Sequence, residues 1–221
     1  MKGREFKYAM YDGLSKLLKA IGNPYRLEII EILSQSEKSV EGIVQATGMS
    51  IANASQHLQV MKNINIVKTR KEGHYVYYSL VNDEMLSLYH HIIKYAVKEI
   101  AELEKILNSQ RKNNKSINAV SLDELESMIE NENVLLIDVR PSIEYEFGHI
   151  IGAISIPLNE LTEKLKNLSK NKEIVAYCRG PFCALSDEAV KILSDQGYNV
   201  RRLDEGYPEW KMKHFELNQT N

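Results

Sequence analysis

Both cysteines of the 221-residue chain lie in one short segment, in which four residues separate Cys178 from Cys183. An apolar run, Ile174–Ala176, precedes the segment, and a helix-like pattern follows it. A thiol between a buried strand and a helix start faces backbone N–H groups and the positive end of a helix dipole. Because this setting stabilises an anion, we expect Cys178 to ionise more easily than a free thiol. Two cysteines so close in sequence favour catalytic, redox or metal chemistry over a structural disulfide.

The composition indicates a globular protein, since 43% of the residues are hydrophobic and the length suits two modest domains or one large one. The start of the chain, Met1–Lys7, lacks the apolar run of a signal peptide. No segment approaches the roughly 20 apolar residues that a membrane span needs. The sequence therefore predicts a cytoplasmic protein that has no membrane among its partners.

Charge is unevenly distributed along the chain. Residues 1–115 carry 17 Lys and Arg against 12 Asp and Glu, whereas residues 116–221 carry 11 against 18. The net charge of -2 thus combines a basic first half with an acidic second half. We expect the two halves to have different partners.

The first half has the pattern of a helix-turn-helix protein. Apolar residues recur at helical spacing, and capping residues with Gly and Pro separate the segments. Helices are expected over residues 4–20, 24–35 and 50–63, and a short helix between the second and the last of these is expected to be capped by Ser39 and ended by Thr47-Gly48. A short helix, a turn with Gly48 and a further helix form the arrangement that places a recognition helix in the major groove.

The helix expected over residues 50–63 has two different faces when it is turned at 100° per residue. Its apolar face carries Ile51, Ala54, Leu58 and Met61. Its outer face is rich in amides, which can pair with adenine edges, and it has no carboxylate to repel phosphate. The candidate DNA-contacting residues here are Ser50, Asn53, Ser55, Gln56, His57 and Gln59.

A basic hairpin follows this helix. Two β-rich runs, Ile66–Lys71 and His74–Leu80, flank Glu72-Gly73, which predicts a hairpin with these two residues as its turn. Such a wing could lie along the DNA backbone, with Arg70, Lys71 and His74 as its contacting residues.

Residues 10–105 resemble the ArsR-type winged-helix repressors. The segments that carry the resemblance are Leu17–Leu27, Ser50–Leu58 and Gly73–Tyr78. The resemblance implies a homodimer on a palindromic double-stranded DNA operator, with terminal helices at the interface. A long helix expected over residues 83–108 fits dimerisation, and an ordinary core helix is the alternative.

Metal sensing, which many members of that family perform, is not expected here. The third helix lacks the cysteine of the thiolate sensors. His90 and His91 are adjacent, so on a helix they point about 100° apart and cannot share a metal as an i,i+4 pair could. The sequence predicts neither a metal site nor a cofactor.

The second half has the pattern of an α/β domain. The expected strands are 134–139, 174–177 and 199–203, and the expected helices are 121–129, one from 159, and 185–196. Apolar strands that alternate with helices are typical of a parallel sheet covered on both faces. An active site is then expected at the carboxyl ends of the strands, where Cys178 lies. Residues 108–116 have no apolar side chain, so we predict a DNA-binding and dimerisation domain over 1–108, a linker over 109–117 and a second domain over 118–221.

Residues 118–215 resemble a single rhodanese (sulfurtransferase) domain. The resemblance rests on four ordered blocks: Leu136–Arg140 with Glu144, Phe147–Ala153 with Pro157, the Cys178 loop, and Leu203–Trp210. Glu205 stands where the family usually has a glycine. Related phosphatases and arsenate reductases end the loop with an arginine that holds a tetrahedral oxyanion, but residue 184 is alanine. The six-residue loop from Cys178 to Cys183 instead matches the sulfur-carrying members.

The resemblance implies that a sulfane sulfur moves to the Cys178 thiolate, giving a persulfide in a cradle that includes Gly180, Phe182 and Ala184. Two roles stay open. Arg179 attracts an anionic donor or is a solvent-exposed arginine, and Cys183 attacks the persulfide or packs as a small apolar residue. Asp138 and His149 are expected to be structural supports.

Together these patterns predict a dimeric transcriptional regulator, a repressor, whose DNA affinity changes when a small sulfur-containing donor reacts at Cys178, Cys183 and Arg179. The alternative from the enzyme class is a thiosulfate or polysulfide sulfurtransferase with an accessory DNA-binding domain. A third possibility is a DNA-binding protein whose inactive rhodanese domain senses another ligand.

Overall fold

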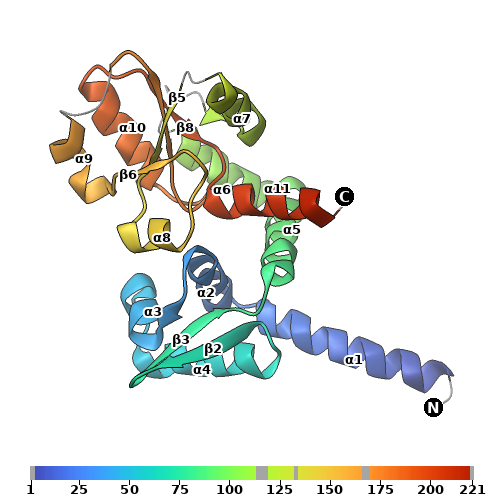
Figure 1. Ribbon diagram of the computed structural model, residues 1–221. Helices are drawn as coiled ribbons and strands as arrows, with labels where there is room; N and C mark the ends of the chain where they lie inside the picture. Colours follow the sequence, from blue (N-terminus) through green and yellow to red (C-terminus); the bar gives the residue numbers. More distant parts are fainter. Residues whose placement is uncertain (1–2, 113–118, 132–133, 166–169, 220–221) are drawn as a thin grey trace. The chain divides into compact units, whose positions relative to one another are not determined.

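The computed structural model describes residues 3–112, 119–131, 134–165 and 170–219 (Figure 1). The chain forms two compact units, Met1–Tyr89 and His90–Asn221. The first is a winged helix-turn-helix and the second an α/β unit with a parallel sheet, so the predicted fold classes are confirmed. No helix within the described ranges is long and apolar enough to cross a membrane.

The N-terminal unit begins with four helices whose starts the sequence marks by capping residues. The side chains of Asn23, Ser39 and Ser50 accept hydrogen bonds from backbone N–H groups in the first turns of the second, third and fourth helices. Gly48, with φ of +71°, ends the third. The helices are α1 (Gly3–Ile21), α2 (Pro24–Gln35), α3 (Val40–Thr47) and α4 (Ile51–Asn63).

The core of this unit packs α2, α3 and α4 together through Ile30, Ile43 and Leu58, none of which is exposed. The expected apolar face of α4 is correct for Ala54, Leu58 and Met61. It is wrong for Ile51, whose side chain is 59% exposed, because the first turn of α4 extends past the core.

The wing is a three-stranded antiparallel sheet in the order β1-β3-β2. Its strands are β1 (Lys38–Ser39), β2 (Val67–Glu72) and β3 (Tyr75–Leu80). Glu72 pairs with Tyr75, so the turn residues are Gly73 and His74, and the prediction of a Glu72-Gly73 turn is wrong by one residue. The reason is backbone geometry: Gly73 has φ of +59°, the sign that a type II′ turn requires at its first central position.

The long helix expected over residues 83–108 is two helices, α5 (Asp83–Glu99) and α6 (Ala101–Lys112). Ile100 lies between them and still donates its N–H to Ala96. Neither Pro nor Gly occurs there, so the sequence contains no local mark of the interruption. The first four residues of the expected linker, 109–112, are helical in α6, and residues 113–117 lie outside the described residues.

The sheet of the C-terminal unit is parallel and has the order β4-β8-β7-β5-β6. Its strands are β4 (Ala119–Val120), β5 (Val134–Asp138), β6 (Ile154–Ser155), β7 (Glu173–Tyr177) and β8 (Val200–Leu203). The remaining helices are α7 (Leu122–Glu130), α8 (Ser142–Phe147), α9 (Leu158–Lys164), α10 (Leu185–Asp195) and α11 (Tyr207–Gln219).

Helices cover both faces of this sheet (Figure 1). Successive residues of β7 point to opposite faces, so Ile174 and Ala176 pack against α9 and α10, whereas Val175 and Tyr177 pack with α7 and α11. Cys178 follows β7 and joins the core on the α10 side. The expected position of the thiol at the carboxyl end of a central strand is therefore confirmed.

Candidate functional site

The cysteine loop, Cys178–Ala184, connects β7 to α10 and holds two free thiols. Cys178 is buried, with 1% of its surface exposed, and Cys183 is half-buried. The two thiols are hydrogen-bonded to each other. The sulfur of Cys178 also lies 3.5 Å from the carbonyl oxygen of Cys183 and 3.4 Å from the hydroxyl of Ser186.

The two thiols differ in acidity. The hydrogen bond to Cys183, together with burial, holds the pKa of Cys178 well above its ordinary value. The same hydrogen bond, with further bonds from the backbone N–H groups of Leu185 and Arg179, lowers the pKa of Cys183 to about 6. The prediction that Cys178 ionises easily is therefore wrong, because its bond to Cys183 and its burial raise its pKa more than the N–H group of Gly180 and the hydroxyl of Ser186 lower it.

Arg179 is anchored by an acidic residue of α8. Its Nε and Nη2 lie 3.0 Å and 2.7 Å from the carboxylate of Glu144, which is buried. A buried carboxylate needs such a partner because an unpaired charge is costly to bury. The side chain of Arg179 is 31% exposed. It is therefore not simply a solvated arginine, and its guanidinium fixes the loop to α8.

The three predicted cradle residues belong to the loop that holds the two thiols. Gly180 has φ of +143°, a conformation that a side chain would strain. Phe182 is 50% exposed, and Ala184 occupies the N-cap position of α10 without a side-chain hydrogen bond. The chain at 184 thus turns directly into the helix, which brings the N–H group of Leu185 toward Cys183.

Gly206, which the sequence analysis did not single out, packs against the backbone of the cysteine loop. A β-carbon at Gly206 would lie 2.5 Å from both the carbonyl oxygen of Cys178 and the amide nitrogen of Gly180. The turn between β8 and α11 therefore packs directly on the backbone of the cysteine loop. Its neighbour Glu205 is half-buried, and burial raises its pKa. The block Leu203–Trp210 had marked this turn, but not the close contact.

Asp138 and His149 are anchors, as predicted. Asp138 accepts hydrogen bonds from the backbone N–H of Arg140, from its guanidinium and from the hydroxyl of Tyr177. His149 is bonded through Nδ1 to the carbonyl oxygen of Tyr145, at 2.9 Å, and stacks on that ring. Asp138 thereby ties the segment after β5 to the end of β7, directly before Cys178.

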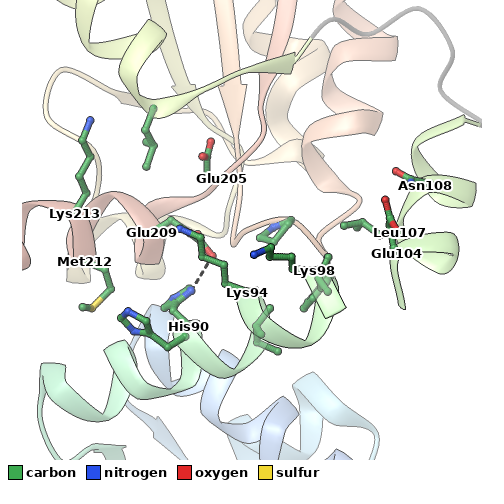
Figure 2. A pocket seen from close by; sticks show the side chains of 16 residues that line it. His90, Lys94, Lys98, Glu104, Leu107, Asn108, Glu205, Glu209, Met212 and Lys213 are labelled. Carbon is green, nitrogen blue, oxygen red and sulfur yellow. Dashed lines mark ion pairs between the residues drawn. The ribbon is translucent and has the colours of Figure 1, made fainter. Parts of the chain in front are cut away.

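A cavity of about 950 Å³ lies beside the loop within the C-terminal unit and is lined by α5, α6, α11 and the loop residues Pro181 and Phe182 (Figure 2). His90 points toward Glu209 across it, with 3.3 Å between Nδ1 and Oε1. Burial and the neighbouring His91 lower the pKa of His90 to about 4, so at neutral pH the ring is uncharged and the contact is not an ion pair. The other carboxylate oxygen of Glu209 accepts the N–H of Gly206.

The candidate DNA-contacting residues have different environments. Ser55, Gln56 and Gln59 are exposed on α4, Asn53 is half-exposed, and Ser50 caps the helix. His57 is half-buried, with its ring beside Tyr25 and its Nδ1 3.3 Å from Arg26. On the wing, Lys71 and His74 are exposed, whereas the guanidinium of Arg70 is bonded to Glu37 and Glu72. The side chain of Arg70 is 51% exposed, and such exposed pairs contribute little free energy.

Comparison with known proteins identifies both units. The model of the arsR family of bacterial regulatory proteins matches residues 23–69, and that of the rhodanese-like domain matches residues 121–213. The HTH-type transcriptional regulator Rv0324 of Mycobacterium tuberculosis is 38% identical over 210 residues, which are 93% of this chain and 90% of that protein. The chain belongs to the arsR family of regulators. It is a regulator of this family with a C-terminal rhodanese-like domain.

Other relatives match one unit each. The putative sulfurtransferase YtwF of Bacillus subtilis is 32% identical over 96 residues, covering 43% of this chain and 91% of that protein. The NMR structure of the homodimeric winged helix-turn-helix DNA-binding domain of Mb0332 from Mycobacterium bovis is 33% identical. It covers 45% of this chain and 91% of that chain, with a TM-score of 0.42.

Proposed function

We propose that this arsR-family regulator binds a palindromic DNA operator as a homodimeric repressor, and that sulfane sulfur on its cysteine loop changes its affinity for that operator. The observation that carries the proposal is the pair of hydrogen-bonded free thiols at the carboxyl end of a central strand. One chain thus joins a DNA-binding unit to a loop whose chemistry suits sulfur.

Two neighbouring thiols can react with a sulfane donor to give two products. A thiolate attacks the outer sulfur of thiosulfate, the S–S bond of the donor breaks, and sulfite leaves with the electron pair, so that the loop keeps a persulfide. Attack of the second thiol on the inner sulfur of this persulfide forms a disulfide and releases hydrosulfide. Each product differs from the resting thiols in charge or in covalent linkage, so each can shift the loop.

Loading with thiosulfate is expected to change the operator affinity of the full chain on the order of tenfold, a usual size of coupling between two sites. The measurement is a gel-shift titration at one stated salt concentration, because phosphate contacts make affinity salt-dependent. The Cys178→Ser/Cys183→Ser protein is the control and should bind with the affinity of unloaded protein under both conditions. Equal affinities for the thiol protein and for the thiosulfate-treated protein would contradict the proposal, provided that intact mass verifies a product: one added sulfur atom for the persulfide, or the loss of two hydrogens for the disulfide.

Gln56→Ala is expected to weaken binding to the operator by roughly 1 to 3 kcal/mol, because Gln56 is an exposed amide on the outer face of α4. The loss should be smaller on unrelated DNA, to which phosphate contacts supply most of the affinity. The matched control is Gln196→Ala, which removes an exposed glutamine from the other unit. Equal losses on operator and unrelated DNA would mean that Gln56 does not read bases.

A sulfurtransferase with an accessory DNA-binding unit is the second candidate, and the similarity of the C-terminal unit to a putative sulfurtransferase favours it. This function predicts multiple turnovers of sulfur from thiosulfate to a thiol acceptor, abolished in the Cys178→Ser/Cys183→Ser protein. It also predicts that no sequence is selected from a random DNA pool. Selection of a palindromic sequence from that pool would favour the regulator.

A further inference from the structure

We propose that Ser186 is a further catalytic residue beside the cysteine loop, and that its hydroxyl donates a hydrogen bond to the sulfur of Cys178 whenever that sulfur is an anion. The inference rests on the proposed function and adds a residue to the chemistry at its site. Ser186 belongs to α10 and follows Cys178 by eight residues, so it lies outside the loop itself.

Ser186 is the polar member of an otherwise apolar helix face. The buried residues of α10 recur at helical spacing and are Ser186, Ala189, Val190 and Leu193. The three apolar ones belong to the same core cluster as Cys178. The exposed fraction of Ser186 is only 2%. Because the burial of a hydroxyl costs free energy unless it is hydrogen-bonded, a serine on this face needs a specific partner.

The partner of this hydroxyl is the sulfur of Cys178. The distance between Ser186 Oγ and Cys178 Sγ is 3.4 Å. Within the part of the chain that the structure describes, the hydroxyl of Ser186 makes no other hydrogen bond. Helix capping does not account for it, since Ala184 occupies the N-cap position of α10. The position of this buried hydroxyl is therefore explained by its contact with the reacting sulfur.

A hydroxyl can bond to Cys178 in both of its protonation states. The carbonyl oxygen of Cys183, 3.5 Å from the sulfur, can only accept a proton and suits the neutral thiol. The backbone N–H of Gly180 can only donate and suits the anion. The hydroxyl of Ser186 rotates, so it can accept from the thiol and donate to the thiolate. It thus stabilises the anion without leaving an unpaired donor beside the resting thiol.

Negative charge develops on Cys178 in two steps of the proposed chemistry. In loading, Cys178 loses its proton to solvent, its thiolate attacks the outer sulfur of thiosulfate, the S–S bond of the donor breaks, and sulfite leaves with the electron pair. In unloading, the thiolate of an acceptor thiol attacks the outer sulfur of the persulfide, the S–S bond breaks, and its electron pair stays on Cys178. The same thiolate is the nucleophile of the first step and the leaving group of the second. One hydrogen bond from Ser186 therefore assists both steps.

Titration of Cys178 in the full-chain Cys183→Ala protein tests the hydrogen bond. The chain has two cysteines, so Cys178 is then the only thiol and no second thiol is coupled to it. The NMR shift of Cβ in the isotope-labelled cysteine follows its ionisation and needs no reagent to reach the buried sulfur. Ser186→Ala in this protein should raise the midpoint by roughly one to two pH units, because a hydrogen bond to a charged group is lost. Ser186→Thr, which keeps the hydroxyl, should retain the midpoint.

Ser194→Ala is the matched control, because it removes an exposed hydroxyl from the same helix and should leave the midpoint of Cys178 unchanged. The charged group nearest the thiol, the guanidinium of Arg179, keeps its partner Glu144 in every variant. An unchanged midpoint in the Ser186→Ala protein would overturn the proposal. So would equal rises in the alanine and threonine variants, since the hydroxyl would then not be the cause.

Sulfur uptake by the same proteins from thiosulfate, followed by intact mass, tests the role of this bond in the reaction. For each unit by which the midpoint rises, the thiolate fraction at neutral pH falls about tenfold, while the thiolate becomes roughly threefold more nucleophilic. Ser186→Ala should therefore slow loading roughly three- to tenfold at neutral pH, and should not slow it above the midpoint.

A loading rate that is lower at every pH would overturn the catalytic role, because damage to packing does not depend on the ionisation of Cys178. Failure of the proposed function has a different signature. If the wild-type protein reacts with no sulfur donor, the proposed function is contradicted, while the titration still decides whether Ser186 stabilises the anion of Cys178.

Discussion

Asp138→Ala is expected to destabilise the C-terminal unit by roughly 3 to 5 kcal/mol, because it leaves the guanidinium of Arg140 buried without its carboxylate. The side chains of both residues are completely buried. Removal of one partner from such a pair costs more than the pair itself contributes, since the remaining charge keeps its desolvation penalty. This is the largest effect on stability that we expect from a single substitution in the chain.

Asp138 links three segments that meet beside the cysteine loop. Its carboxylate lies 2.6 Å from Nη2 of Arg140 and 2.6 Å from the hydroxyl of Tyr177, which precedes Cys178 in β7. The hydroxyl of Tyr177 in turn accepts the N–H of Ile150, and Arg140 donates to the carbonyl of Gly148. Loss of Asp138 therefore leaves buried groups of several segments without their acceptor.

Denaturant unfolding followed by tryptophan fluorescence measures this effect, because Trp210 is the only tryptophan of the chain and belongs to the C-terminal unit. Tyr177→Phe, which removes only a hydroxyl, should cost about 1 to 3 kcal/mol. Glu146→Ala removes an exposed carboxylate near the same segment and should stay within about 0.5 kcal/mol of wild type. A cost for Asp138→Ala no larger than that for Glu146→Ala would mean that the buried pair does not stabilise the unit.

Much of the fold was predictable because its strongest sequence signals, helix caps and apolar runs, are local. Asn23, Ser39 and Ser121 cap helices within the reach of three residues, and the apolar runs at 134–139 and 174–177 are long enough to show a strand. The two-residue strands β1, β4 and β6 have no periodicity of their own and exist only because a longer strand lies beside them. The turn at Gly73 was misplaced by one residue because hairpin register depends on pairing across the strands.

The position of the candidate site was predictable, but the division of roles within it was not. A cysteine at the end of a buried strand marks the loop in the sequence. The backbone N–H groups that bond to each thiol come from different points of the loop, Gly180 for Cys178, and Arg179 and Leu185 for Cys183. The partner of Arg179 is Glu144, 35 residues earlier in the chain, and the backbone of the loop is supported by Gly206. Contacts over such distances in sequence follow from the packed sheet and not from any local pattern.

Gly206→Ala is expected to displace the cysteine loop and to slow the reaction of Cys183. The added β-carbon would lie 2.5 Å from two backbone atoms of the loop and 2.6 Å from a third, the carbonyl carbon of Arg179. Backbone atoms cannot rotate away as the end of a side chain can, so either the loop or the turn after β8 must move. Overpacking of this kind typically costs about 1 to 3 kcal/mol. Because the shift separates Cys183 from the N–H groups that stabilise its thiolate, the midpoint for its alkylation should move to higher pH.

Two measurements separate damage to the loop from general destabilisation of the Gly206→Ala protein. Trp210 fluorescence during unfolding gives the stability. The pH profile of Cys183 alkylation, recorded without denaturant at a temperature at which the variant is folded, gives the acidity of the thiol. The control is Glu205→Ala, which places an alanine one residue earlier in the same turn without adding an atom near the loop. Burial raises the pKa of Glu205, and its carboxylate bonds to the backbone N–H groups of Glu205 and Leu122, so its loss should cost only about 1 kcal/mol. The alkylation profile of Cys183 should be unchanged in the control. If Gly206→Ala also leaves that profile unchanged, the turn after β8 does not position the loop, and the acidity of Cys183 must come from β7 and α10 alone.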